Sequence, residues 1–387
     1  MGDIANSIIP ITKARRVFKK HKSCVTGVGV FPNGDRMVTS SDDKTLCLWD
    51  LKDGVVLKEM EGHGCWVKAV AVSKDGKLIA SGDGEGKLMT WDGDTGESLT
   101  EAIKAHSAAI SSLDFSPHNA MLATASWDNK VKLWGTDALQ IVRGAPSVTI
   151  NVGVPIHCVR YSPSDKAILA IATNAHIQIW NPNGLKCIAK LTANCRSFAW
   201  TPDGRRLLAG PYYLGTTIRE WDTTTWTQVG GPWGSHSSVL AVNSTGTLLA
   251  SASLDNSVRL WRISDRRIIA VFRHSKPVTY ITFCPDGKYI LCGCWSTDVT
   301  EWGIPENAFL EDISNADTSS VGFSSFQSHC HLISPKETSS DDVTDEPGTN
   351  DVISQRFRTL QIGSNLDAKT PEYHYMASLN VPLLFAL

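Results

Sequence analysis

A repeat of about 40 residues, each copy ending in tryptophan, constrains the fold of this chain more than any other sequence feature. Successive copies are spaced by 42, 43, 46, 41, 40 and 41 residues. The copies end at Trp49, Trp91, Trp134, Trp180, Trp221, Trp261 and Trp302. A period of this length holds about four short strands, and such units bury their apolar faces by stacking on one another. We therefore expect one array of seven similar units.

Turn signals recur at a fixed place in the repeat. A four-residue signal ends fifteen residues before six of the tryptophans and seventeen residues before Trp221. The signals end at Gly34, Gly76, Asn119, Asp165, Gly204, Gly246 and Gly287. Proline presets an early turn position, whereas glycine and asparagine tolerate positive φ at a late one, so the signals predict hairpins. Apolar strand patterns flank them and no comparably strong helical period appears, which predicts an all-β chain.

Short motifs within the repeats resemble those of the WD-repeat family. They are the dipeptides Gly62-His63, Trp49-Asp50, Trp91-Asp92 and Trp221-Asp222. The resemblance covers residues 13 to 303 and implies a seven-bladed β-propeller of four-stranded antiparallel blades. The family closes its ring with a strand that precedes the first repeat, and residues 11 to 19 are the candidate here. The same stretch also has the composition of a basic nuclear-localisation patch, although the structural interpretation is favoured.

The resemblance also implies a hydrogen-bonded set of four side chains in each blade: a histidine before the first strand, a serine or threonine in the second, an aspartate in the next turn and the tryptophan of the third. Repeat one supplies His21, Thr39, Asp43 and Trp49. Repeat three supplies His106, Thr124, Asp128 and Trp134 at identical offsets. We expect these two blades to be the most tightly held.

The other repeats depart from this set. Glu85 stands at the carboxylate position of repeat two, and repeat five has Leu191 at the histidine position and a two-residue insertion within residues 210–215. The remaining departures are Val152 and Asn174 in repeat four, Trp233 in repeat six, and Cys292 and Ser296 beside His274 in repeat seven. A buried ring N–H without an acceptor costs about 1 to 3 kcal/mol. Blades four and five are therefore expected to be the weakest.

Composition divides the chain into three parts. We expect an N-terminal extension over residues 1–12, the propeller over 13–303, and an acidic, Ser-rich, largely disordered tail over 304–387. Lys plus Arg number 33 against 27 Asp plus Glu up to Gly303, and 4 against 12 beyond it. An excess of six positive charges spread over 303 residues forms no obvious phosphate-binding stripe, which disfavours nucleic acid as a partner.

Sites of chemistry are not evident in the sequence. The ten cysteines form no CxxC pair, and the cluster His329-Cys330-His331 lacks a second ligand group, so no metal site is predicted. No phosphate-binding glycine loop or dinucleotide fingerprint is present, so no cofactor is expected. His21, His63, His106 and His274 fall at the structural position of the repeat, so no catalytic residue is expected. The chain shows no signal-peptide pattern or membrane-spanning run, which predicts the cytoplasm, with the nucleus left open.

The turns on one face of such a ring form its default binding surface. In the resembled family contacts often come from two positions per blade: one just before the first strand, and one just before the turn aspartate. These positions hold the candidate protein-binding residues Trp66, Trp127, His236, Leu254 and Trp295. Tryptophan is enriched at binding hot spots because it buries a large apolar area and keeps one N–H donor. The alternative is that each ring only packs over the turn of its own blade.

The sequence thus predicts a non-catalytic scaffold or adaptor that binds other proteins, as a monomeric propeller within larger complexes and without a membrane partner. A ubiquitin-ligase substrate receptor is one alternative, weakened because Lys52 stands where such receptors carry arginine after Trp49-Asp50. A subunit of a chromatin or RNA-associated complex is another, weakened by the modest charge. An enzyme is disfavoured because no catalytic group of residues is left unexplained by the repeat.

Overall fold

The computed structural model describes Ile8 and residues 10–136, 145–164, 168–211, 217–234 and 239–309. The chain divides into two units, Met1–Leu310 and Glu311–Leu387, and all the described residues belong to the first. The expected disorder of the tail therefore concerns residues that lie almost entirely outside the described part. Residues 212–215, which make up most of the predicted insertion in repeat five, also lie outside it.

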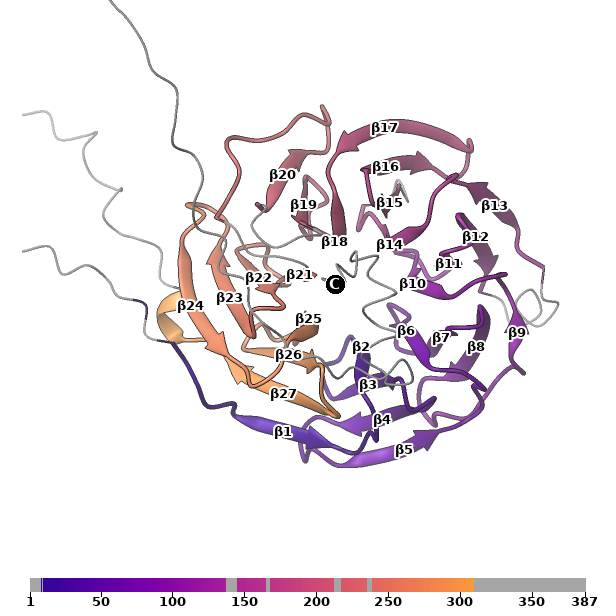
Figure 1. Cartoon of the computed structure of the whole chain (residues 1–387), viewed down its shortest axis with the longest axis horizontal. Coiled ribbons are helices and arrows are strands. Elements are labelled where there is room, and N and C mark those ends of the chain that lie inside the picture. Colours follow the sequence, from indigo (N-terminus) through magenta and orange to yellow (C-terminus); the bar gives the residue numbers. More distant parts are fainter. Residues whose placement is uncertain are drawn as a thin grey trace, which may run out of the picture. The chain divides into compact units, whose positions relative to one another are not determined.

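Seven antiparallel sheets are arranged as blades around a central axis (Figure 1). We number each blade by the repeat whose tryptophan lies on its third strand. Blade one consists of β2 (Val25–Val30), β3 (Arg36–Ser41), β4 (Leu46–Asp50) and β5 (Val56–Met60). Blade two consists of β6 (Val67–Val72), β7 (Leu78–Asp83), β8 (Lys87–Asp92) and β9 (Ile103–Lys104). Blade three consists of β10 (Ile110–Phe115), β11 (Met121–Ser126), β12 (Lys130–Gly135) and β13 (Val148–Asn151).

Blade four has the same order, whereas blade five is shorter. Blade four consists of β14 (Ile156–Tyr161), β15 (Leu169–Thr173), β16 (His176–Asn181) and β17 (Lys186–Thr192). Blade five has three described strands, β18 (Cys195–Trp200), β19 (Arg206–Pro211) and β20 (Arg219–Asp222). Its outer segment is irregular and pairs with β20 through a bridge between Gln228 and Trp221 and through a hydrogen bond from the Val229 amide to the Glu220 carbonyl at 2.8 Å. The expected four-stranded blades are thus present, with the outer strand of blade five reduced to this segment.

Blades six and seven complete the ring. Blade six consists of β21 (Val239–Val242), β22 (Leu248–Ala252), β23 (Ser257–Arg262) and β24 (Ile268–Arg273). Blade seven consists of β25 (Val278–Phe283), β26 (Tyr289–Cys294), β27 (Asp298–Gly303) and, outermost, β1 (Arg16–Lys19) from the start of the chain. The one short helix among the described residues is the 3₁₀ turn η1 (Glu306–Phe309).

The predicted closure by the N-terminal strand is confirmed. β1 pairs antiparallel with β27, placing Arg16 opposite Glu301 and Lys19 opposite Asp298. The Arg15 guanidinium also lies 3.0 Å from a Glu301 carboxylate oxygen. The basic residues of this segment thus have structural partners. Pairing the first strand with the last blade also removes an open sheet edge.

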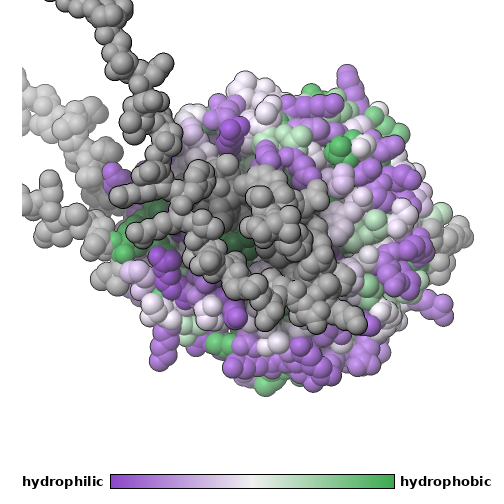
Figure 2. All heavy atoms as spheres, viewed as in Figure 1, coloured by the Kyte–Doolittle hydropathy of each residue, from purple (hydrophilic) through white to green (hydrophobic). Residues whose placement is uncertain are grey.

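Apolar side chains between neighbouring blades form the core. One cluster joins Phe18 and Leu291 of blade seven to Val25 and Trp49 of blade one, and every one of these side chains is buried. Large exposed apolar side chains on the described surface, such as Val55 and Leu57, are few, and Figure 2 shows the outer circumference as mainly hydrophilic. No helix in the described part of the chain is long and apolar enough to span a membrane.

Candidate functional site

The predicted side-chain sets of blades one and three are brought together in the structure. In blade one, His21 Nδ1 lies 3.0 Å from Asp43 Oδ2 and its Nε2 lies 2.7 Å from Thr39 Oγ1. The indole of Trp49 donates to the same hydroxyl at 2.9 Å. In blade three the corresponding distances, among His106, Asp128, Thr124 and Trp134, are 2.9, 2.7 and 3.0 Å. Each set links the loop before the first strand to the second and third strands.

The direction of these hydrogen bonds follows from the donors available. A carboxylate only accepts, so a neutral imidazole carries its proton on Nδ1 and accepts at Nε2 from the threonine hydroxyl. Burial lowers the pKa of His106, which favours the neutral ring, although Asp128 opposes that shift. Burial also disfavours the charged form of Asp43, but hydrogen bonds from His21, Thr45 and the Lys22 amide outweigh it and hold its pKa well below the usual value. The imidazoles are therefore structural links.

Blade two corrects the prediction that Glu85 occupies the carboxylate position. Its carboxylate is Asp83, which is fully buried at the end of β7 and lies 3.0 Å from His63 Nδ1. His63 Nε2 lies 2.7 Å from Ser81 Oγ, which also accepts from Trp91 at 2.8 Å. Asp83 stands two residues after Ser81 instead of four, so the carboxylate comes from the strand end and still reaches the ring. Glu85 pairs with Lys87 at 2.9 Å.

The tryptophans of blades four, six and seven find acceptors of different kinds. The indole of Trp180 donates to Gln178 at 2.8 Å, that of Trp261 to Ser251 at 2.8 Å and that of Trp302 to Thr300 at 3.0 Å. The acceptors Gln178 and Thr300 lie on the third strand itself, two residues before the tryptophan. These three blades therefore do not leave the indole N–H unsatisfied, contrary to the cost expected for blade four.

The histidine positions of blades six and seven are less well satisfied. Trp233, which replaces histidine in blade six, is buried and its Nε1 has no hydrogen-bond partner among the described residues. In blade seven His274 Nδ1 lies 3.3 Å from the Cys294 thiol, whereas the predicted polar positions were Cys292 and Ser296. His274 Nε2 has no described partner, and burial lowers the pKa of this ring to about 4. Blade seven thus keeps the histidine without the carboxylate.

Four of the five predicted binding residues lie in connections that lead into a first strand or join a second to a third strand, and these connections share one face of the ring. We call it the rim face and define it by Trp66, Trp127, Leu254 and Trp295. All four side chains are half-buried. The Trp127 amide donates to the Ala109 carbonyl at 3.1 Å, as the Trp295 amide does to Pro277 at 2.8 Å, so each turn is tied to the start of the inner strand. His236, the fifth candidate, lies outside the described residues.

The Trp66 ring packs on its own blade. A Cβ added at Gly84 would come within 2.1 Å of the Trp66 indole, so this ring lies directly on the turn that contains Gly84. This contact agrees with the alternative interpretation, in which the ring packs over the turn of its own blade. Because Trp66 is only half-buried, part of the indole nonetheless faces outward.

A second set of residues on the inner strands was missed from the sequence. Six inner strands carry a register shift at their second residue, and such a bulge re-aims the extra side chain. The bulged residues are Thr26, Lys68, Ser111, His157, Arg196 and Thr279. The signal available in the sequence was a polar residue at the same offset of an otherwise apolar strand.

Three of the bulged residues are hydroxyls that link neighbouring blades. Thr26 donates to the Val67 carbonyl at 2.5 Å, Ser111 to Ile156 at 2.6 Å and Thr279 to Val25 at 3.3 Å. Each acceptor is the first residue of the next inner strand. Blades two, four and five carry Lys68, His157 and Arg196 at this position instead.

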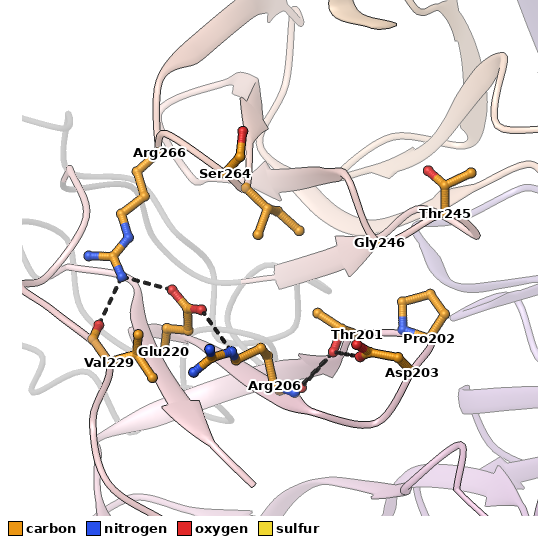
Figure 3. A pocket seen from close by; sticks show the side chains of 11 residues that line it. Thr201, Pro202, Asp203, Arg206, Glu220, Val229, Thr245, Gly246, Ser264 and Arg266 are labelled. Atoms are coloured by element: carbon orange, nitrogen blue, oxygen red, sulfur yellow. Dashed lines mark hydrogen bonds and ion pairs between the residues drawn. The ribbon is translucent and has the colours of Figure 1, made fainter. Parts of the chain in front are cut away.

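A pocket of about 400 Å³ lies between blades five and six, near the turns of the opposite face (Figure 3). Its charged side chains pair with one another. Arg266 lies 3.0 Å from Glu220 and also donates to the Val229 carbonyl at 2.9 Å, while Arg206 lies 3.7 Å from Glu220. These contacts hold the irregular outer segment of blade five against blade six, which gives the pocket a structural explanation.

No group of three or more His, Cys, Asp or Glu side chains in the described residues could hold a metal ion. The predicted exclusion of His329-Cys330-His331 concerns residues outside that part. A serine and an aspartate of blade six, Ser251 and Asp255, also have structural contacts: Ser251 accepts from the Trp261 indole, and Asp255 Oδ1 accepts from the Ser257 amide and hydroxyl.

Comparison with known proteins agrees with this geometry. The chain matches the model of the family described as WD domain, G-beta repeat, over residues 12–50, 54–92, 96–135, 229–262 and 266–302. The unmatched interval covers blades four and five, which depart most from the repeat. The chain is also 31% identical over 169 residues to the small ribosomal subunit protein RACK1y of Oryza sativa subsp. japonica. That alignment covers 42% of this chain and 49% of the rice protein, so the chain spans about half the length of this relative. The chain belongs to the WD-repeat family.

Proposed function

We propose that this protein is a non-catalytic scaffold that binds other proteins on its rim face. The observation that carries the proposal is the recurrence of half-buried tryptophans, Trp66, Trp127 and Trp295, on three blades of that one face. Indoles in this position offer apolar area and an N–H donor to a partner, and they are already ordered by the turns beneath them. A rigid ring with several such turns suits the simultaneous binding of more than one protein.

The absence of catalysis is part of the proposal. Its support is that the imidazoles of His21, His63 and His106 each lie between a carboxylate and a hydroxyl within one blade. A general base needs a free ring nitrogen beside a substrate, which these rings lack. The rice relative is named as a protein of the small ribosomal subunit, which supports a role within a larger assembly in the cytoplasm.

Quantitative affinity purification from cells tests this function. The double variant Trp66→Ala/Trp295→Ala removes two rim indoles, and we expect recovery of partner proteins to fall at least tenfold while the unfolding midpoint stays close to that of the wild type. Leu185→Ala is a matched control, because Leu185 is a large exposed apolar residue of a turn between third and fourth strands, on the opposite face. Equal loss in the control, or full recovery of every partner by the double variant, would contradict the proposal.

A further inference from the structure

Two Asn-Gly pairs occur in the sequence, Asn33-Gly34 and Asn183-Gly184, and a proline precedes each of them. Asn33 lies in the turn between β2 and β3 of blade one, and Asn183 lies in the turn between β16 and β17 of blade four. Both turns lie on the face opposite the rim face, and both asparagine side chains are exposed. The same tripeptide thus occurs twice with similar exposure, which makes the two turns a matched pair.

An Asn-Gly pair can deamidate without an enzyme. The backbone nitrogen of the glycine loses its proton and attacks the side-chain carbonyl carbon of the asparagine. A carbon–nitrogen bond forms, the side-chain amide takes up a proton and leaves as ammonia, and a five-membered succinimide results. Water then opens either carbonyl of the succinimide, which gives aspartate or isoaspartate. Glycine favours the attack because it has no side chain and its backbone adopts many conformations.

In blade four both reacting groups are accessible. The Gly184 amide donates to no acceptor within the part of the chain that the structure describes. The Asn183 side chain makes no hydrogen bond to a described residue, although its backbone amide donates to Asn181 Oδ1 at 3.0 Å. A Cβ added at Gly184 would meet no atom within 4 Å, so the space beside the pair is open. Neither hydrogen bonding nor packing therefore opposes ring formation here.

In blade one both reacting groups are held by hydrogen bonds. The Gly34 amide donates to the Phe31 carbonyl at 2.9 Å. Asn33 Nδ2 donates to Asp35 Oδ2 at 3.1 Å, and Asn33 Oδ1 accepts from the Asp35 amide at 3.2 Å. The attack requires the glycine amide to give up the proton that it shares with Phe31 and the asparagine side chain to leave Asp35. The folded turn therefore opposes the reaction at Asn33.

We propose that Asn183 is a site of spontaneous deamidation, through a succinimide formed with Gly184, and that the fold protects Asn33 from the same reaction. Water is the only co-reactant, and ammonia is the only leaving group. The product carries a new negative charge on the face opposite the rim face. The modification is therefore separate from the proposed function.

The isoaspartate form has a further consequence for blade four, because it adds one atom to the main chain. The Leu185 amide donates to the Pro182 carbonyl at 3.4 Å across this turn, and β17 begins at Lys186, which pairs with Asn181. A longer main chain at position 183 changes the span of the turn. We therefore expect hydrogen exchange at the start of β17 to be faster in the isoaspartate form than in the unmodified protein.

Peptide mapping by mass spectrometry tests the proposal on the full chain, incubated at 37 °C and pH 7.4. We expect Asn183 to deamidate at least tenfold faster than Asn33 in the folded protein. In the urea-unfolded chain both turns are lost, so the two rates should agree within about threefold. Equal rates in the folded protein, or a faster reaction at Asn33, overturn the proposal.

Gly184→Ala tests the role of the attacking glycine. Gly184 does not adopt a positive φ and a Cβ there meets no atom, so alanine fits and the unfolding midpoint should be unchanged. The added methyl group hinders the attack, and we expect deamidation of Asn183 to slow at least fivefold. Gly303→Ala is the matched control, because Gly303 has the same open surroundings but follows a tryptophan. Equal rates at Asn183 in the two variants overturn the proposal.

The products identify the route of the reaction. A succinimide opens to both isoaspartate and aspartate, whereas direct hydrolysis of the side-chain amide gives aspartate alone. We expect both products at position 183, each with one oxygen from the solvent when the incubation is carried out in oxygen-18 water. The rate should rise between pH 7 and pH 9, because the glycine amide must lose its proton. Aspartate alone, or no product from a folded chain whose unfolded form deamidates, overturns the proposal.

Discussion

Blades one to three and blades six and seven use the same repeat but satisfy their buried polar groups differently. In blades one to three a histidine joins a carboxylate to a hydroxyl, and the tryptophan donates to that hydroxyl. In blades six and seven the tryptophan still finds an acceptor, but Trp233 Nε1 and His274 Nε2 have no described partner. The indole bond is thus the retained element, and the carboxylate–imidazole link is the part that later blades give up.

The largest expected loss of unfolding free energy follows from removing the buried carboxylate of blade two. Asp83 accepts from His63 at 3.0 Å and from the Glu85 and Lys87 amides at 3.0 and 2.8 Å. Asp83→Ala removes a charged acceptor of three bonds in a fully buried place, and we expect a loss of about 3 to 5 kcal/mol in unfolding free energy. Glu85→Ala should change it by less than about 0.5 kcal/mol. Urea unfolding measures both, and a larger effect of Glu85→Ala would restore the sequence-based assignment.

The next effect concerns the shared hydroxyl. Thr124→Val keeps the shape of the side chain but removes the partner of both His106 and Trp134, and we expect a loss of about 2 to 4 kcal/mol. Ser251→Ala in blade six removes the acceptor of Trp261 alone and should cost about 1 to 2 kcal/mol. Chemical unfolding of the two variants under the same conditions checks the ratio. Equal losses would show that the histidine bond adds nothing to the blade.

A pH-dependent effect sharpens the contrast between blades two and seven. Burial lowers the pKa of His274 to about 4, so the unfolded chain binds this proton more readily and stability is lost as pH falls from about 6.5 towards 4. Cys292→Ser/Cys294→Asp copies Ser81 and Asp83 of blade two and should raise the His274 pKa. The fall in the urea midpoint between pH 7.5 and pH 5 should therefore be smaller in this variant than in the wild type. An unchanged fall would show that His274 does not titrate in this range.

The smallest expected effect lies in the turns between third and fourth strands. Blades one and two have Gly54 and Gly96 there with positive φ, whereas Leu185 adopts φ of 47° in blade four. Because Leu185 is exposed, Leu185→Gly relieves this conformation at little loss of packing, and we expect a gain of about 0.5 to 1 kcal/mol. Arg266→Gly should destabilise instead, since its guanidinium holds Glu220 and Val229. Thermal unfolding distinguishes the two, and a loss in both would contradict this explanation.

Much of the fold could be predicted because its determinants are local. The spacing of the tryptophans and turns indicated seven blades, and the segment before the first repeat supplied the closing strand. The irregularity of the outer segment of blade five was not evident, because its path beyond Gln228 depends on the backbone conformation of two glycines and a proline. Asp83 was overlooked because the carboxylate of blade two was assigned by its position in the repeat. The contact is instead decided by which carboxylate reaches the histidine ring from the end of the strand.

The candidate site was only half visible from the sequence. The rim tryptophans could be placed because they adjoin turns with fixed offsets. Lys68, His157 and Arg196 were missed because nothing in one repeat shows that the second residue of the inner strand is bulged. Such a bulge depends on how the first two strands pair, so the sequence indicated the face but not these residues.

Site-specific photo-crosslinking in cells tests most directly whether the rim face is the binding surface. Benzoylphenylalanine would replace Trp127 or Trp295 on that face in one pair of proteins, and Leu185 on the opposite face in a third. We predict that positions 127 and 295 yield crosslinks to other proteins, with overlapping partners, and that position 185 yields none of these. Crosslinks to the same partners from position 185, with none from the rim face, would contradict the proposed binding surface.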